Sequence, residues 1–179
     1  GVIGRLKPDR GYDVILKAFK HVKERTGNVK LIVMGRSSQL EKSIKQPILE
    51  LGLQNDVILA GYRVDDYFSM IALFDLYIMM RAGSDGSARA LREVMAMGKP
   101  AIVSDMGMLP ELVEDGKTGF VVKPETADLA GQMEIILKDE QKRIAFGANA
   151  KKTAIEKWNY GSQAKQMAYF YEKLLAMKS

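Results

Sequence analysis

The sequence predicts an α/β domain built on a parallel β-sheet with helices on both of its faces. Short apolar runs rich in Val and Ile recur along most of the chain. They are continuous rather than alternating, which is typical of strands that are buried on both faces. Between these runs, apolar residues recur three and four positions apart, as they do in amphipathic helices. This alternation of strands and helices favours a doubly wound sheet with right-handed crossovers.

About six strands are expected in this sheet, one from each apolar run. They are Val2-Ile3, Val29 to Met34, Val57 to Ala60, Leu76 to Met80, Ala101 to Val103 and Phe120 to Val122. Helical spacing is clearest from Val14 to Val22 and from Leu91 to Met95. Pro47 and Pro110 are each expected to open a short helix, because a proline ring fits the first helical turn and disrupts the interior.

After the sixth strand the pattern becomes entirely helical. Thr126 is expected to cap a helix that runs to about Lys138, and a second helix covers about Glu140 to Lys157. A third helix, with apolar residues from Ala164 to Leu175, closes the chain. We therefore expect residues 1–179 to form one Rossmann-like domain with a helical C-terminal extension.

The composition is that of an ordinary globular domain and excludes several kinds of site. Hydrophobic residues make up 47% of the 179 residues and charged residues 27%, which argues against a disordered or fibrous chain. There is no cysteine, so disulfides and a thiolate nucleophile are excluded. The single histidine, His21, cannot by itself form a metal site or a Ser/His/Asp triad, and we expect it on a helix surface.

Charge and hydropathy bear on partners and location. Lys and Arg total 27 against 22 Asp and Glu, giving a net charge of +5, which suits phosphate-bearing partners without selecting one. No apolar run approaches the roughly 20 residues that span a bilayer, and no signal peptide is recognisable. We therefore expect a cytoplasmic protein.

Arginine follows four of the predicted strands, as Arg5, Arg36, Arg63 and Arg81. Ligands of open α/β sheets bind outside the carboxyl ends of the strands. We therefore expect these side chains to share one edge of the sheet, where guanidinium groups can receive an anion. Lys7 and Arg10 make the first of these loops densely basic. The alternative is that exposed loops collect arginine by chance.

The segment from Gly83 to Glu93 is the most informative part of the sequence. Its small residues lie between a strand and a helix, where free backbone N–H groups and the helix N-terminus favour a phosphate. It matches neither the Walker A pattern nor the dinucleotide fingerprint. Glu93 is placed to accept hydrogen bonds from vicinal hydroxyls such as those of ribose, and Asp85 from those of a second ring. Alternatively, Asp85 caps the helix and Glu93 is a solvated charge.

Taken in this order, the motifs resemble the nucleotide-sugar-binding C-terminal half of the retaining GT-B glycosyltransferases of family four. Gly4-Arg5-Leu6 followed by Arg10-Gly11 is similar to that family's GRL…KG loop. The segment from Asp85-Gly86-Ser87-Ala88 through Glu93 to Pro100 is similar to its EGFG…EAMACGxP motif. The resemblance continues from Pro110 to Val122 and covers essentially the whole chain in the correct order and spacing.

The resemblance implies an enzyme that transfers a sugar from a UDP, GDP or ADP sugar to a glycan, lipid or other acceptor. It implies retention of the anomeric configuration and no metal or other cofactor. Arg5 and Arg10 would neutralise the diphosphate leaving group, Asp85 would orient the donor sugar, and Glu93 would bind the ribose. Arg63, beside Tyr62, would lie by the base. The further donor-binding residues implied are Gly4, Gly86, Ser87, Ala88, Arg89 and Ala90.

Three positions depart from the family pattern. Asp85 stands where glutamate is usual and is one methylene shorter, so its contact with the donor sugar would be shifted or mediated by water. Ser87 stands where phenylalanine is usual and would open the loop. Arg10 stands where lysine is usual, which keeps the charge but changes its geometry.

The family fold has a second Rossmann-like domain, with the acceptor site and a catalytic histidine loop, and no part of this chain resembles it. Gly1 to Gly4 has the pattern of a strand already under way, so we expect a segment upstream. The chain alone is expected to bind the donor and transfer little. The full-length enzyme is expected to act in polysaccharide or lipopolysaccharide synthesis, with peripheral membrane contact. Apolar residues of the last helix are expected to be partly exposed and to promote self-association.

Two other classes of function stay open at this point. One is a nucleotide-sugar epimerase of the same fold, although we find no match to the catalytic carboxylates and histidines of those enzymes. The other is a non-catalytic module that binds nucleic acid or an acidic surface through the basic edge. Because no aromatic residues interleave with the arginines as a stacking platform, nucleic acid is not the expected partner.

Overall fold

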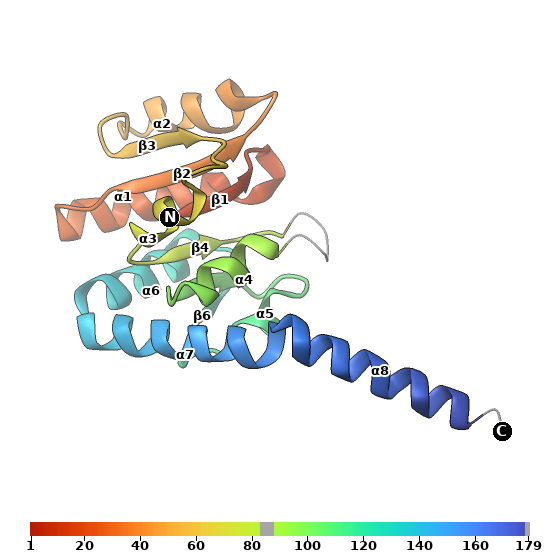
Figure 1. The fold of residues 1–179 in the computed structure, drawn as a ribbon. Helices are drawn as coiled ribbons and strands as arrows, with labels where there is room; N and C mark the ends of the chain where they lie inside the picture. Colours follow the sequence, from red (N-terminus) through yellow and green to blue (C-terminus); the bar gives the residue numbers. More distant parts are fainter. Residues whose placement is uncertain (83–87, 178–179) are drawn as a thin grey trace.

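The computed structural model describes residues 1–82 and 88–177 and has the predicted parallel strands at its centre (Figure 1). Six strands lie within these residues: β1 (Val2–Arg5), β2 (Leu31–Arg36), β3 (Val57–Gly61), β4 (Tyr77–Met79), β5 (Ala101–Ser104) and β6 (Gly119–Val122). All six predicted strands are confirmed. The second begins later than expected, because the Val29 N–H still donates to the Gly27 carbonyl in the turn before β2.

The strands form two parallel ladders, ordered β1-β2-β3 and β4-β5-β6, rather than one continuous ladder. The ladders meet where β1 lies beside β4. There the Ile78 N–H donates to the Gly1 carbonyl over 3.0 Å, and the Tyr77 hydroxyl donates to the Ile3 carbonyl over 3.3 Å. The spatial order is therefore β3-β2-β1-β4-β5-β6. The chain changes direction across the sheet between β1 and β4, and ligands of such folds bind at this switch point.

Ten helical segments occur in the part of the chain that is described. They are the 3-10 helix η1 (Pro8–Arg10), the π-helix η2 (Glu41–Lys45), and the α-helices α1 (Tyr12–Thr26), α2 (Gln46–Glu50), α3 (Tyr67–Ala72), α4 (Arg89–Ala96), α5 (Leu109–Leu112), α6 (Thr126–Lys138), α7 (Glu140–Trp158) and α8 (Tyr160–Ala176). Pro110 lies in the first turn of α5, as predicted. Pro47 lies in the first turn of α2 but does not open a helix, because η2 runs into α2 without a break. The prediction that Thr126 caps α6 is wrong: Glu125 has the extended cap conformation, and its carbonyl accepts from the Leu129 N–H.

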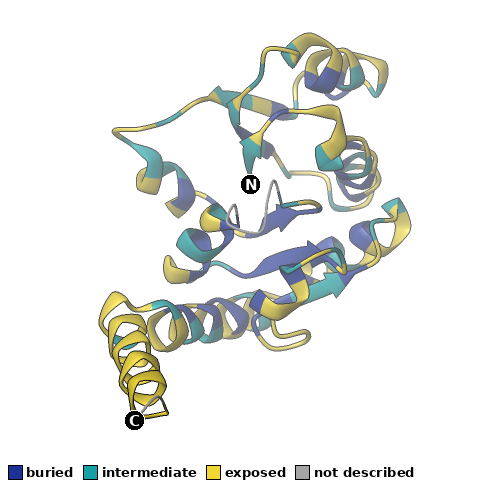
Figure 2. Cartoon of the chain, turned by 90° about the vertical axis from the view of Figure 1, so that its right-hand side faces the viewer, coloured by how far each residue is buried: buried dark blue, intermediate teal, exposed yellow. Residues whose placement is uncertain are grey.

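Alternate residues of the strands enter two different cores, which confirms that helices cover both faces of the sheet. Ile78 and Met80 belong to a core shared with α1, α2 and α6. Tyr77 and Met79 belong to a core shared with α3, α4, α5 and α7. β4 and β5 are fully buried between these layers, whereas β1 and β3 are mostly intermediate or exposed, and Figure 2 shows this difference in colour across the sheet. His21 lies on the exposed face of α1, as predicted.

Helix α8 extends away from the rest of the molecule (Figure 1) and has no buried residue along Tyr160–Ala176. The side chain of Asn159 caps it, accepting from the N–H groups of Gly161 and Ser162. Several large apolar side chains of this helix are exposed, as the sequence predicted, while self-association stays a prediction. Within residues 1–82 and 88–177, no helix is both long and apolar enough to cross a membrane.

Candidate functional site

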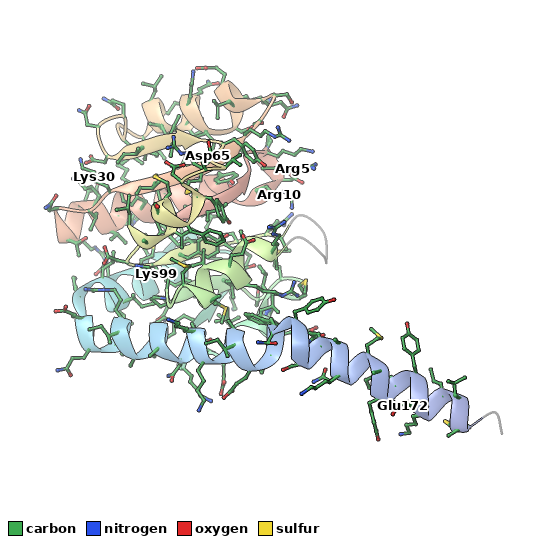
Figure 3. The ribbon with its side chains drawn as sticks, viewed as in Figure 1. Arg5, Arg10, Lys30, Asp65, Lys99 and Glu172 are labelled. Atoms are coloured by element: carbon green, nitrogen blue, oxygen red, sulfur yellow. The ribbon has the colours of Figure 1, made fainter. Side chains whose placement is uncertain are left out.

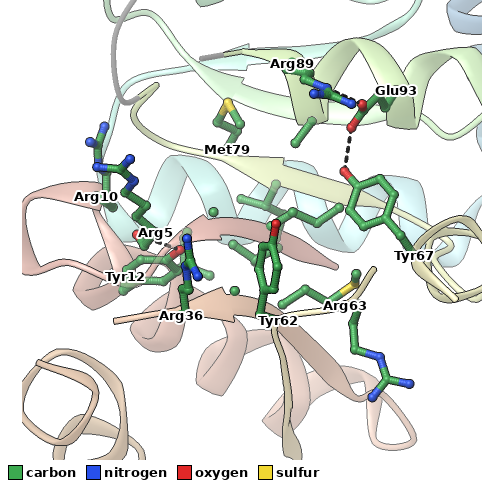
Figure 4. Close-up of a pocket in the computed structure, with 18 of the residues that line it drawn as sticks. Arg5, Arg10, Tyr12, Arg36, Tyr62, Arg63, Tyr67, Met79, Arg89 and Glu93 are labelled. Carbon is green, nitrogen blue, oxygen red and sulfur yellow. Dashed lines mark hydrogen bonds and ion pairs between the residues drawn. The ribbon is translucent and has the colours of Figure 1, made fainter. Parts of the chain in front are cut away.

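A pocket of about 840 Å³ opens where the carboxyl ends of β1 and β4 lie side by side (Figure 4). Its walls come from β1, from the ends of β2 and β4, from η1 and the start of α1, and from the residues that follow β3 and β4, together with α3 and the first turns of α4. This is the switch point of the strand order, where the sequence placed its candidate site. The volume is within the usual range for a site that holds a small organic ligand.

Two glycines allow the backbone segments around this pocket to approach closely. Gly35 is paired with Gly4 across β1 and β2, and a Cβ on Gly35 would lie 1.8 Å from the Gly4 carbonyl oxygen. Gly35 also has a φ of 144°, which favours glycine. Gly11 has a φ of 75°, and a Cβ there would lie 2.8 Å from the Cβ of Met80. These contacts bring the loop after β1 against the end of β4.

Arginine dominates the pocket wall. The six that line it are Arg5, Arg10, Arg36, Arg63, Arg81 and Arg89. All four arginines predicted to share one edge of the sheet are therefore confirmed in that position. The Arg5 side chain is exposed and has no ion pair within the described part of the chain. Arg10 is more enclosed: its side chain is 16% exposed, and its Nη1 donates to the Ala82 carbonyl over 2.5 Å.

Two other arginines of the pocket, Arg36 and Arg63, are held by their neighbours. The Arg36 guanidinium stacks over the Tyr62 ring, with its carbon 4.8 Å from the ring centroid. Arg63 donates through Nε to Oδ1 of Asp66 over 2.8 Å and through Nη2 to the other carboxylate oxygen. The same ion pair holds the pKa of Asp66 below its ordinary value. Figure 4 shows the Arg63 guanidinium directed away from the centre of the pocket. Its assignment to a nucleotide base stays a prediction.

Glu93 lies on the opposite side of the pocket from Arg5 and Arg10 (Figure 4). Its Oε1 accepts from Arg89 Nε over 2.6 Å, and its Oε2 accepts from the Tyr67 hydroxyl over 2.6 Å. The Glu93 side chain is 20% exposed, whereas that of Arg89 is 84% exposed. The alternative that Glu93 is a solvated charge is therefore wrong. Burial, followed by the Glu93 carboxylate, raises the pKa of the Tyr67 hydroxyl well above its ordinary value, so this group stays a donor.

The structure places most of the predicted site residues in this one pocket. Those that line it are Gly4, Arg5, Arg10, Arg63, Arg89, Ala90 and Glu93. Ala88 is instead buried in the core at the start of α4, and the role of its backbone amide stays a prediction. The predictions for Asp85, Gly86 and Ser87 fall outside the described residues.

Sequence reasoning missed Tyr67 and its neighbour Phe68, which also line the pocket. Both belong to α3, a helix that was not predicted. The available signal was position: they follow β3 by a few residues, in the same way that Arg10 follows β1. The pocket thus combines guanidinium groups, which bind phosphate, with a fixed carboxylate, which accepts hydrogen bonds from hydroxyls.

Comparison with known proteins gives the family. The family model "Glycosyl transferases group 1" matches residues 1–153. A GDP-mannose-dependent phosphatidylinositol monomannoside mannosyltransferase of Mycobacterium tuberculosis is 27% identical, over 94% of this chain and 46% of that protein. A lipopolysaccharide 1,2-N-acetylglucosaminetransferase of Salmonella typhimurium is 27% identical, over 95% and 48%. The chain thus spans about half the length of these relatives.

Solved structures agree on the fold. Anabaena Alr3699/HepE, crystallised in complex with UDP, is 28% identical with a TM-score of 0.84, over 96% of this chain and 48% of that one. The C-terminal domain of a glycosyl transferase group 1 protein from Francisella tularensis has a TM-score of 0.77 at 18% identity, over 89% of this chain and 85% of that domain. The fold is therefore that of the C-terminal domain of GT-B glycosyltransferases, and the chain belongs to the glycosyl transferases group 1 family.

Proposed function

We propose that this chain is the donor-binding half of a glycosyltransferase and that its pocket holds a nucleoside diphosphate sugar. The observation that carries the proposal is the division of the pocket between two kinds of group. Arg5 and Arg10 lie at one side, and Glu93, held by two donors, lies at the other. A nucleoside diphosphate carries matching groups, with an anionic diphosphate and a ribose that bears vicinal hydroxyls.

Within this proposal, Arg5 and Arg10 act on the diphosphate. Negative charge grows on the diphosphate oxygen as its bond to the anomeric carbon of the sugar breaks. Guanidinium groups fixed beside that oxygen stabilise the charge where it develops. The hydrogen bond from Arg10 to the Ala82 carbonyl keeps one of these groups in place before the donor arrives. Since arginines supply the positive charge, we propose that transfer needs no metal. On the resemblance to the retaining family, we also propose that transfer retains the anomeric configuration.

Once the diphosphate is placed at Arg5 and Arg10, the ribose and the base are assigned to neighbouring parts of the pocket wall. Glu93 accepts hydrogen bonds from the ribose, and the base lies toward the Arg36 and Tyr62 pair. The amides around the start of α4, with Asp85, act on the phosphates and the donor sugar. Related crystal structures support a donor of this class, because the Anabaena protein was crystallised with UDP and with UDP-glucose.

The acceptor is assigned to a second domain. The relatives are about twice as long as this chain, which leaves room in them for such a domain. We propose that the acceptor is a glycan or lipid, on the support of relatives that are named for phosphatidylinositol mannoside and lipopolysaccharide synthesis. We also propose that the complete enzyme acts at the cytoplasmic side of a membrane. No relative or structure named above is an epimerase or a nucleic-acid-binding protein.

Isothermal titration tests the proposal directly. Purified chain is titrated with UDP, GDP and ADP and with the corresponding glucose or mannose conjugates. We expect at least one nucleotide to bind, and its sugar conjugate to compete for the same site. Arg25→Ala is the control variant, because Arg25 is exposed on α1 and pairs with Glu134 of α6, outside the pocket. The absence of binding by all three nucleotides at millimolar concentration would overturn the proposal.

A further inference from the structure

Tyr67 joins two helices that meet at the pocket. It is the first residue of α3, and its hydroxyl donates over 2.6 Å to a carboxylate oxygen of Glu93 in α4. Phe68 packs edge to face against the Tyr67 ring, with 5.2 Å between the ring centroids, which restricts the ring. Figure 4 shows the Tyr67 hydroxyl directed at Glu93 from across the pocket wall. The contact thus fixes the carboxylate from outside its own helix.

Arg89, the second donor to Glu93, restricts the conformation of the Glu93 side chain less than Tyr67 does. Arg89 belongs to the same helix, four residues earlier, and its side chain is 84% exposed. Exposed ion pairs of this spacing contribute little to holding a side chain in one conformation. A half-buried hydroxyl is different, because leaving it without a partner is unfavourable. We therefore expect the Tyr67 hydroxyl to determine the orientation of the Glu93 carboxylate.

The orientation matters because of what the carboxylate still offers. An ionised carboxylate has about four acceptor positions, and Tyr67 and Arg89 occupy one on each oxygen. The remaining positions can receive two neighbouring hydroxyls only if the carboxylate plane is fixed toward them. We propose that Tyr67 is a positioning residue that aligns Glu93 for the ribose hydroxyls and so sets the preference for ribonucleotides over deoxyribonucleotides. This inference rests on the proposed donor site and adds a residue to it.

The test compares ribose and deoxyribose nucleotides in Tyr67→Phe, which keeps the ring and removes the hydroxyl. UDP, GDP and ADP, and the 2′-deoxy and 3′-deoxy counterpart of each, are titrated in separate experiments. We expect the unmodified chain to prefer the ribonucleotide by about tenfold or more, as for loss of a hydrogen bond to a charged group. In Tyr67→Phe, affinity for the ribonucleotide falls by about three- to tenfold. Affinity for the deoxyribonucleotides changes little, so the ratio of ribonucleotide affinity to deoxyribonucleotide affinity becomes smaller.

Tyr77→Phe is the matched control, because it too removes a tyrosine hydroxyl that donates a hydrogen bond, in this case to the Ile3 carbonyl, but Tyr77 does not line the pocket. This variant is expected to keep the ratio of ribonucleotide to deoxyribonucleotide affinity of the unmodified chain, even if it lowers the midpoint of thermal unfolding. The double variant Tyr67→Phe with Glu93→Gln is expected to bind like Glu93→Gln alone, because the two residues act through one contact.

The outcomes separate this inference from the proposed function. If the unmodified chain does not distinguish ribose from deoxyribose, or if Glu93→Gln keeps the full preference, the role proposed for Glu93 is overturned. If both behave as expected but Tyr67→Phe keeps the ratio of the unmodified chain, only the role of Tyr67 is overturned. Additive losses in the double variant would contradict it equally, because they would show that Tyr67 acts independently of Glu93.

Discussion

The two sides of the pocket are built in different ways. On the basic side (Arg5, Arg10 and Arg36), cations extend from the last residues of β1 and β2 and from η1, and the Arg5 guanidinium has no ion pair within the described residues. On the carboxylate side (Tyr67, Arg89 and Glu93), a single anion is enclosed between two helices with a donor on each of its oxygens. One side presents three separate cations, and the other presents the acceptors of a single carboxylate in a fixed direction.

This difference agrees with the chemistry of the two groups that we propose to bind. Charge on a diphosphate is spread over several oxygens, so a cation can stabilise it from several directions. A hydroxyl has one proton to donate, and its hydrogen bond weakens steeply when the acceptor is misdirected. The basic side is therefore expected to recognise charge, and the carboxylate side is expected to recognise the sugar of the nucleoside.

The largest effect is expected from removing charge on the basic side. In the double variant Arg5→Ala with Arg10→Ala, two charged contacts to the diphosphate are lost, which corresponds to about 3–6 kcal/mol of binding free energy. Affinity for the bare nucleoside should change little, because the carboxylate side is intact. Titration with the nucleoside diphosphate and with the nucleoside measures both. Equal losses for the two ligands would contradict the division of the pocket, and Arg25→Ala is the control for charge alone.

Gly35→Ala tests whether the basic side depends on the close approach of β1 and β2. The added Cβ would lie 1.8 Å from the Gly4 carbonyl oxygen, at a φ of 144° that alanine rarely adopts, so the strands must shift. We expect a loss of about 3 kcal/mol in the free energy of unfolding, measured by chemical denaturation. Gly27→Ala is the control: it also has a positive φ, but its Cβ meets no atom within 4 Å. Similar losses in both variants would assign the effect to backbone conformation rather than to the strand contact.

Glu93→Ala removes the acceptor of the carboxylate side. We expect a loss of about 1.5–3 kcal/mol in binding free energy, the usual range for a hydrogen bond to a charged group. In contrast to the arginine variants, the loss should be the same for nucleoside and nucleoside diphosphate, because both carry the ribose. Unchanged affinity in a variant that remains folded would remove Glu93 from the site. A loss confined to the diphosphate would reverse the assignment of the two sides.

The sequence predicted the basic side better than the carboxylate side, for a physical reason. Each of the four arginines ends or closely follows its own strand, so its place at the edge of the sheet depends only on the strand being parallel. The contact between Tyr67 and Glu93 joins residues that are 26 positions apart and depends on how α3 packs against α4. No local spacing encodes that packing. The short α3 was itself missed, because six residues with few polar positions give no clear helical period.

The sequence also did not predict that a neighbouring carboxylate would bind one of the arginines. Arg63 was expected to face a ligand because it follows β3, but Asp66 lies three residues later and receives its guanidinium in the structure. At a helix start, a carboxylate three residues from an arginine is within reach of its fork. The strand ends could therefore be placed from the pattern of apolar runs, whereas the partners of their side chains could not.

The smallest effect is expected at the opposite end of the strands, where charge serves stability. Asp56 directly precedes β3 and pairs with Lys23 and Lys30, both at 2.8 Å. Figure 3 shows Lys30 on the other side of the molecule from Arg5 and Arg10. Hydrogen bonds from Lys23 and then Lys30 hold the pKa of Asp56 below its ordinary value of 3.8. A carboxylate whose pKa is lowered on folding stabilises the fold above its unfolded pKa, and this contribution is lost as the pH falls through the folded pKa.

Asp56→Asn should therefore lower the thermal midpoint at pH 7, and the difference from the unmodified chain should disappear as the pH falls below about 4. Midpoints measured from pH 7 to pH 3 check this, with Glu172→Gln as the control, since Glu172 is exposed on α8 and has no ion pair among residues 1–82 and 88–177. Nucleotide affinity at pH 7 should stay unchanged, because Asp56 does not line the pocket. A difference that grows in acid would contradict the sign of the pKa shift. A loss of nucleotide affinity would show that Asp56 contributes to nucleotide binding as well as to stability.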